Sequence, residues 1–320
     1  MLLFILLSLW ASPCFTSLLP NQDRVEILMD NVVYVQVPYD RNTKVHVPLT
    51  CGQSYQDQAV FWKKDGKEQK PALRGNSVSV VVEEMGGGNY TCHSGSDRRV
   101  LNHTLVLVKL DSDNQHVILE KPPTGGPIHC SAPNYNGAFH CKWKRTRLRS
   151  GASVLQVKVQ RNGTAIPCTL LVDGSGVHCQ DSSCPHSEEQ HHISITVCMR
   201  NHARLEEYSK QFFLRDIVRP DKLQNLRSSE ESVFSWDLPD TWAQPCSFYS
   251  LEFEVKVVDE DQPCSWDGHI LEGITDERQF KVDVESNGYV FCVRARDKFT
   301  SGPWSHWSQC MVPENMMKTC

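Results

Sequence analysis

Two tryptophan–serine pairs near the C-terminus, beginning at Trp304 and Trp307, constrain this chain more than any other feature. Tryptophans at this spacing fit neither an amphipathic helix nor a strand of period two, but they share a face in an extended segment with about three residues per turn. The preceding residues 289–296 alternate between apolar and polar types, which predicts a strand with Arg294 and Arg296 on its outer face. If the two segments pair, the guanidinium groups can lie against the indoles, and each cation–π contact contributes about 0.5–2 kcal/mol.

This combination resembles the signature of class I cytokine receptors, in which Trp-Ser-x-Trp-Ser follows a strand containing Val-Arg-Ala. In that family the signature lies late in the second of two fibronectin type III-like domains. The resemblance implies a β-sandwich for the C-terminal part of the chain. It also makes Trp304 a candidate for C-mannosylation, a modification of the first tryptophan in such runs.

A second pattern, between residues 51 and 92, is typical of an immunoglobulin-type sandwich. Cys51 is followed by Trp62, and Tyr90 stands two residues before Cys92. In such domains the two cysteines bridge the sheets, the tryptophan packs on the bridge and the tyrosine forms a corner. We therefore expect a Cys51–Cys92 disulfide, which stabilises a fold by about 4 kcal/mol in the chain-entropy account.

The length of 320 residues suits three β domains of about 100 residues each. The expected fold class is therefore all-β, with three tandem β-sandwiches, one immunoglobulin-like followed by two fibronectin type III-like. A linker rich in proline and glycine near residue 124 and a proline-containing junction near residue 219 separate these parts. The expected domain boundaries are residues 18–115, 124–217 and 218–320.

The first 17 residues are expected to form a signal peptide, because a short apolar run gives way there to Ser12-Pro13-Cys14. That run is too short to span a membrane, and no later stretch reaches membrane-spanning length. We therefore expect a secreted, extracellular protein without membrane insertion. The net charge of −5, without a basic stripe, argues against a nucleic-acid partner.

The cysteine count indicates an oxidising compartment, because the chain has fourteen cysteines. Without Cys14 thirteen remain, and an odd number leaves at least one thiol free or bonded to another molecule. Cys130 and Cys141, with Trp143 two residues further on, resemble the cysteine pair in the first fibronectin-like domain of cytokine receptors. The resemblance implies a Cys130–Cys141 bridge between neighbouring strands.

A second group of cysteines follows in the same predicted domain. A hairpin stapled by Cys168 and Cys179 leaves Cys184 in a polar loop, where it is available for an interchain disulfide. A Cys184–Cys198 bridge is the competing interpretation. Nearby histidines also suit zinc, but their spacing matches no usual zinc pattern and disulfides prevail in this compartment, so no metal is expected.

The last predicted domain contains Cys246, Cys264, Cys292 and Cys310, which allow three connectivities. Cys292 shares a strand face with the two ladder arginines, which favours Cys292–Cys310 as the next rung and leaves Cys246–Cys264 as the second bridge. Cys198 and Cys320 have no clear mate in the sequence.

Three sequons predict N-glycosylation, at Asn89, Asn102 and Asn162. Asn162 precedes a glycine and is expected to be the most exposed. Asn89 lies next to the predicted tyrosine corner, where access is expected to be poorer. We find no catalytic signature and no phosphate-binding loop, so neither enzymatic activity nor a cofactor is expected.

The order of the predicted domains is similar to that of the soluble beta subunits of interleukin-12- and interleukin-23-type cytokines. The similarity covers nearly the whole mature chain and is most specific at residues 90–93, 179–185, 212–217 and 239–242. It implies a heterodimer with a four-helix-bundle alpha subunit of the interleukin-12 or interleukin-23 type, disulfide-linked through Cys184 in the former. It also implies immune signalling through a cell-surface receptor chain that binds the immunoglobulin-like domain, and a possible disulfide-linked homodimer.

The resemblance further implies that the elbow between the last two domains holds the alpha subunit, and aromatic side chains with a charged rim are typical of such interfaces. For Tyr249, a position in the core is as good an interpretation as a position in this interface. The alternatives are a soluble or decoy class I cytokine receptor and an adhesion-type immunoglobulin/fibronectin protein. The candidate elbow residues are Arg204, Asp240, Trp242, Phe248, Tyr249, Lys298 and Phe299.

Overall fold

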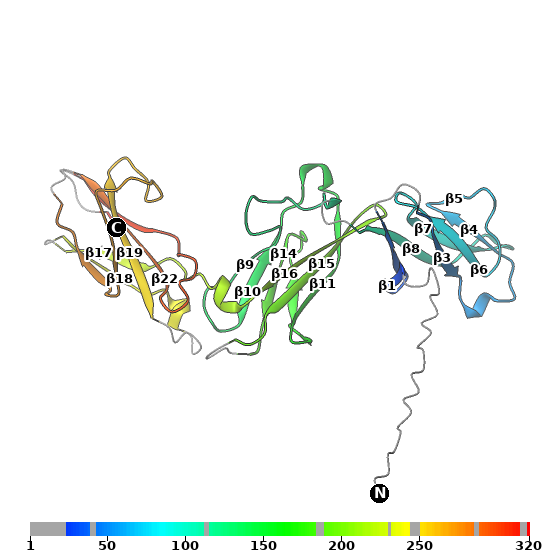
Figure 1. Ribbon diagram of the computed structural model, residues 1–320, viewed down its shortest axis with the longest axis horizontal. Helices are drawn as coiled ribbons and strands as arrows, with labels where there is room; N and C mark the ends of the chain where they lie inside the picture. The colour runs from blue at the N-terminus through cyan, green and yellow to red at the C-terminus, as the bar shows by residue number, and fades with distance from the viewer. Residues whose placement is uncertain are drawn as a thin grey trace, which may run out of the picture. The chain divides into compact units, whose positions relative to one another are not determined.

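A computed structural model describes residues 24–38, 43–111, 115–183, 189–229, 232–243, 250–284, 288–313 and 319–320. The described chain is almost entirely β-structure, and its α-helical part is the short α1 (Leu214–Ile217) (Figure 1). No helix in these ranges is long and apolar enough to cross a membrane. The predicted signal peptide lies outside the described residues.

Two compact units make up the chain, each described here by itself. The first is Met1–Gln115 with His202–Leu205, and the second is His116–Asn201 with Glu206–Cys320. Both predicted fibronectin-like domains fall in the second unit except for residues 202–205, and the three predicted boundaries remain a prediction.

Strands of the first unit form a ladder in the order β1-β2-β8-β7-β4-β5 and a separate pair, β3-β6. Cys51 follows β3 and Cys92 lies within β7, and their disulfide joins the two sheets. Trp62 is 1% exposed and donates from Nε1 to the carbonyl of Gly75 at 2.9 Å. The strands are β1 (Val25–Met29), β2 (Val32–Val37), β3 (Val45–Thr50), β4 (Val60–Lys64), β5 (Lys67–Glu68), β6 (Ser77–Val82), β7 (Gly88–Ser94) and β8 (Val100–Leu110).

The first half of the second unit pairs one ladder, β12-β11-β15-β16, with a four-stranded sheet, β13-β14-β10-β9. Disulfides Cys130–Cys141 and Cys168–Cys179 join register partners in neighbouring strands of that sheet. Cys198 is buried in β15. The strands are β9 (His129–Ser131), β10 (Ala138–Lys142), β11 (Ser153–Arg161), β12 (Thr164–Ala165), β13 (Cys168–Leu170), β14 (Gly176–Gln180), β15 (Ile193–Asn201) and β16 (Arg204–Phe212).

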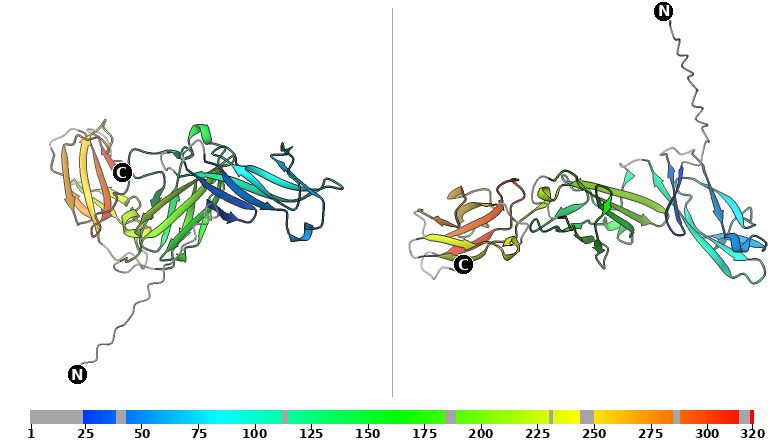
Figure 2. Two further views of the ribbon diagram at one scale, coloured as in Figure 1. Left: turned by 45° about the vertical axis from the view of Figure 1, so that its right-hand side comes forward. Right: turned by 90° about the horizontal axis from the view of Figure 1, so that it is seen from below.

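The second half of this unit has the sheets β17-β18-β21 and β20-β19-β22-β23. Its strands run alongside one another in yellow to red in Figure 2. Trp236 fills the space between the sheets, with its ring 5.4 Å from Phe253 and 6.2 Å from Phe291. The strands are β17 (Gln224–Ser228), β18 (Val233–Asp237), β19 (Leu251–Asp259), β20 (Leu271–Thr275), β21 (Gln279–Lys281), β22 (Tyr289–Asp297) and β23 (Ser308–Val312).

The prediction of Cys292–Cys310 is wrong. In the β22–β23 register, Cys310 lies opposite Phe291 and therefore faces the core, whereas Cys292 lies on the opposite face of the sheet. Cys292 instead bonds to Cys264, in the loop between β19 and β20, and Cys310 bonds to Cys320. This also overturns Cys246–Cys264, and Cys246 itself lies outside the described residues.

Candidate partner-binding site

The two C-terminal tryptophans and the arginines of β22 form a ladder of stacked side chains. Arg294 lies between the indoles, with its guanidinium carbon 5.1 Å from the ring centroid of Trp304 and 4.3 Å from that of Trp307. Arg296 covers the other side of the Trp304 ring at 4.3 Å. Trp307 in turn packs on the buried Cys264–Cys292 bridge. The ladder therefore ends on a disulfide.

Two glutamates of β19, which sequence reasoning missed, neutralise the ladder. Glu252 and Glu254 are the register partners of Arg296 and Arg294, and each accepts a hydrogen bond from the Nε of its arginine. The same alternation that turns Phe253 toward the core turns both glutamates toward the arginines, so this pattern was a usable signal. The two pairs lock the guanidinium planes in the orientation that stacking requires.

The serines of the repeat also have structural roles. Both Ser305 and Ser308 are 2% exposed. The Ser305 hydroxyl accepts a hydrogen bond from the Ala295 backbone N–H at 2.9 Å, and the Ser305 backbone N–H donates to the Ala295 carbonyl at 2.7 Å. The Ser308 hydroxyl donates to the carbonyl of Leu223 at 2.8 Å. These bonds attach the tryptophan segment to β22 and to the residue just before β17.

The elbow within the second unit is built on backbone contacts. Ala132 forms a parallel bridge with Val218, accepting from the N–H of Arg219 at 2.7 Å. The Arg219 Nε donates to the carbonyl of Trp304 at 2.8 Å, which connects the elbow to the ladder. Asn134 donates from its side-chain amide to the carbonyl of Thr241. The two halves of the second unit are therefore joined by a bonded junction.

The structure separates the candidate elbow residues into different environments. Trp242 is 4% exposed and lies edge-on to Tyr135, with centroids 6.2 Å apart, so it is part of the core and its prediction as a contact residue is wrong. Phe299 is 75% exposed. Its neighbour Lys298 is an exposed side chain paired with Asp276. Asp240 is exposed at the start of a 3-10 turn.

Arg204 is part of a different unit from the other described candidates. It belongs to the first unit, where it is the register partner of Val108 and donates to the carbonyl of Gln115. Arg204 is grouped with the first unit because the start of β16 pairs with β8, with Arg204 and Leu205 opposite Val108 and Lys109. Phe248 and Tyr249 lie outside the described residues.

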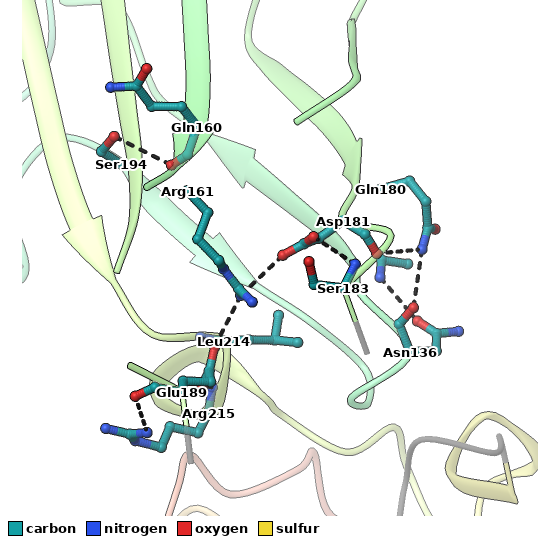
Figure 3. Close-up of polar contacts among 11 residues, drawn as sticks. Asn136, Gln160, Arg161, Gln180, Asp181, Ser183, Glu189, Ser194, Leu214 and Arg215 are labelled. Atoms are coloured by element: carbon teal, nitrogen blue, oxygen red, sulfur yellow. Dashed lines mark hydrogen bonds and ion pairs between the residues drawn. The ribbon is translucent and has the colours of Figure 1, made fainter. Parts of the chain in front are cut away.

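Cys184 also lies outside the described residues, but both flanks of its segment are held by one group, which we call the clasp: Arg161, Asp181 and Glu189. Figure 3 shows the Arg161 guanidinium between the two carboxylates. Its Nη2 atom is 3.0 Å from an oxygen of each, and only the contact with Glu189 is also an aligned hydrogen bond. The Asp181 and Glu189 side chains are 5% and 3% exposed, so the clasp is shielded from solvent.

Glu189 extends the clasp to the helix before the elbow. Its carboxylate accepts from the backbone N–H groups of Leu214 and Arg215 at 2.9 and 3.0 Å (Figure 3). These are the first N–H groups of α1, which have no partner within the helix, and a carboxylate satisfies them well. Asp181 meanwhile accepts from the backbone N–H of Ser183 at 2.9 Å. The clasp thus ties Asp181 and Glu189, the described residues on either side of Cys184, to the end of β11 and to α1.

The three sequons differ in access. Asn162 is exposed in the two-residue turn between β11 and β12, where Asn162 and Gly163 have φ of 47° and 78°, as a tight hairpin turn requires. Asn89 is exposed on β7. The Nδ2 of Asn102, the atom that would carry a glycan, donates to the carbonyl of Cys51 at 3.0 Å. The expected poorer access at Asn89 is therefore wrong, and Asn162 and Asn89 are both accessible glycosylation candidates.

The amino-acid sequence of this chain is similar to those of known proteins. A family described as cytokine interleukin-12p40 C-terminus matches residues 126–201. Interleukin-12 subunit beta of Lama glama is 32% identical over 293 residues, covering 82% of this chain and 85% of the relative. The Homo sapiens protein of that name is 31% identical over 289 residues with the same coverage, and the Sus scrofa protein is 29% identical over 303 residues, covering 88% and 91%.

Proposed function

The chain belongs to the interleukin-12 subunit beta family, and we propose from this premise that it is a secreted subunit that pairs with a four-helix-bundle alpha subunit. The pair would form a heterodimeric cytokine of the interleukin-12/23 type that binds cell-surface receptors, with the immunoglobulin-like part contacting a receptor chain. Secretion is supported by the five disulfides among the described residues. The family relationship also argues against an enzyme, since these relatives are cytokine subunits.

The observation that carries the pairing proposal is the clasp beside the elbow. Arg161 holds residues on both sides of Cys184, and Glu189 joins them to α1, directly before the elbow. Anchoring both flanks lowers the conformational entropy that the segment loses when its cysteine bonds to a partner. Phe299, exposed beside Lys298, offers an aromatic anchor with a charged neighbour for the same partner.

We expect Cys184→Ser to abolish the covalent heterodimer while leaving non-covalent capture of the alpha subunit in place. The chain would be co-expressed with an interleukin-12-type alpha subunit and the secreted material compared by non-reducing and reducing electrophoresis. Ser183→Ala is the matched control, because the neighbouring contact to Asp181 uses the backbone N–H of Ser183. Wild type and the control should give a heavier species that reduction dissolves.

The other outcomes separate the alternatives. If wild type and Cys184→Ser both run as monomers but capture the alpha subunit, the soluble or decoy receptor is the better description. Failure to capture any helical alpha subunit would overturn the proposal and favour an adhesion-type protein. A reducible species formed without an alpha subunit, and lost in Cys184→Ser, would identify the disulfide homodimer.

A further inference from the structure

The sheet β13-β14-β10-β9 consists of two disulfide-stapled strand pairs joined by one ladder. Cys168–Cys179 ties β13 to β14, and Cys130–Cys141 ties β10 to β9. The antiparallel β10–β14 ladder connects the two stapled pairs, and Figure 1 shows these strands side by side. The backbone on both sides of this ladder is thus covalently constrained, which holds the opposing Cα atoms of its register partners in place.

Two histidines lie opposite each other at the middle of that ladder. His140 of β10 and His178 of β14 are register partners on the outer face, since the alternate residues Phe139 and Cys141 are buried in the core. Their ring centroids are 6.0 Å apart and their planes differ by 49°. Both line a cavity of about 570 Å³. Thr169, the register partner of His178 on β13, also lines it.

The surroundings of His140 favour its neutral imidazole form. Burial, then Lys142 and His178, lower the pKa of His140 below its ordinary value. A neutral imidazole has a free ring nitrogen, the form in which histidine binds metals. The other titratable groups on this face are Lys142 and its register partner His129, one row away. Among the described residues that line the cavity there is no carboxylate, the group that would favour a hard cation.

We propose that His140 and His178 together bind a borderline divalent cation, Cu²⁺ or Zn²⁺, with water completing the coordination. Metal–nitrogen bonds of about 2.0–2.1 Å place two rings that share an ion with centroids about 5 Å apart, so a small side-chain rotation from the observed 6.0 Å separation suffices. No group of three or more His, Cys, Asp or Glu ligands is assembled within the described ranges, so two protein ligands hold this ion. We expect Cu²⁺ to bind this site more tightly than Zn²⁺, because divalent metals follow the Irving–Williams order at nitrogen ligands.

The test is calorimetric titration of the full secreted chain with ZnCl₂ and, separately, CuCl₂ at pH 7.4. His140→Gln and His178→Gln should each weaken binding at least about tenfold, because a single imidazole remains. The matched control is His191→Gln/His192→Gln. It removes two exposed histidines that are consecutive in the sequence and belong to the same unit, and it should bind metal as the wild type does. Near-ultraviolet circular dichroism checks that each variant is folded, as expected for outer-face substitutions.

A second readout is thermal unfolding. Zn²⁺ bound across the ladder should raise the Tm of wild type and of the control, but not that of His140→Gln or His178→Gln. Protons compete with the metal ion for the imidazole nitrogens, so binding should weaken as the pH is lowered. Binding that survives in His140→Gln/His178→Gln, or that is lost in His191→Gln/His192→Gln, overturns the proposal.

Discussion

Replacing Arg161 by methionine should lower the free energy of unfolding of the second unit by about 3–5 kcal/mol. The substitution leaves two carboxylates, 5% and 3% exposed, without their shared counter-charge. Glu189 keeps its two backbone donors, whereas the Asp181 carboxylate keeps the backbone N–H of Ser183. Removing one partner of a buried ion pair is costly because the remaining charge stays desolvated. Urea unfolding followed by tryptophan fluorescence measures the change.

Two variants calibrate this loss. Arg161→Lys keeps the charge but replaces a planar fork by a single ammonium group, so a smaller loss is expected. Lys144→Met is the matched control, since Lys144 pairs with Glu120 at 3.0 Å while 79% exposed, and exposed pairs contribute about 0–1 kcal/mol. Equal effects of Arg161→Met and Lys144→Met would show that the clasp does not stabilise the fold.

The same substitution should also reduce the fraction of alpha subunit captured covalently. Without Arg161, none of the side chains in the described ranges connects Asp181 to Glu189, so the two flanks of the Cys184 segment lose their common ion-pair partner. Co-expression at matched secreted amounts, scored on non-reducing gels, separates this effect from stability. Unchanged covalent capture in folded Arg161→Met would restrict the clasp to a structural role.

The ladder could be predicted from the sequence because its information is local. The tryptophan spacing and the alternation of β22 place the four stacking residues on one face without reference to distant parts of the chain. The neutralising glutamates Glu252 and Glu254 lie on another strand, so their pairing with the arginines depends on the β19–β22 register. For the same reason the strand face of Cys292 was predicted correctly but its disulfide partner was not. The register of β23 decides which face of the sheet Cys310 takes.

The clasp had no such local signal. Arg161 ends β11, Asp181 follows β14 and Glu189 precedes β15, so only the packing of the sandwich brings the three side chains together. Trp242 was wrongly predicted as an interface residue. An aromatic residue in a predicted loop suggests an interface anchor, and only its packing against Tyr135 shows that it belongs to the core. Interface and core aromatics share composition and differ only in burial.

Replacing Arg294 by alanine should cost about 2–4 kcal/mol of unfolding free energy. The substitution removes stacking on two indoles, each contact contributing about 0.5–2 kcal/mol, and leaves Glu254, 9% exposed, without its cation. Partial exposure of Arg294 itself, at 26% of its side chain, keeps the estimate below that for Arg161. Arg296→Ala should cost less, because Arg296 stacks on Trp304 alone.

The control for the ladder is Arg227→Ala, which breaks an arginine–carboxylate pair of the same chemistry with Asp237. That pair is exposed, and no cation–π contact of Arg227 is found among the described residues, so its loss should have little effect on stability. Denaturant unfolding of the three variants should therefore rank them Arg294→Ala, Arg296→Ala and Arg227→Ala in decreasing destabilisation. If Arg294→Ala is no worse than Arg227→Ala, then stacking between the tryptophans adds nothing to stability, and the repeat must be retained for contact with another protein.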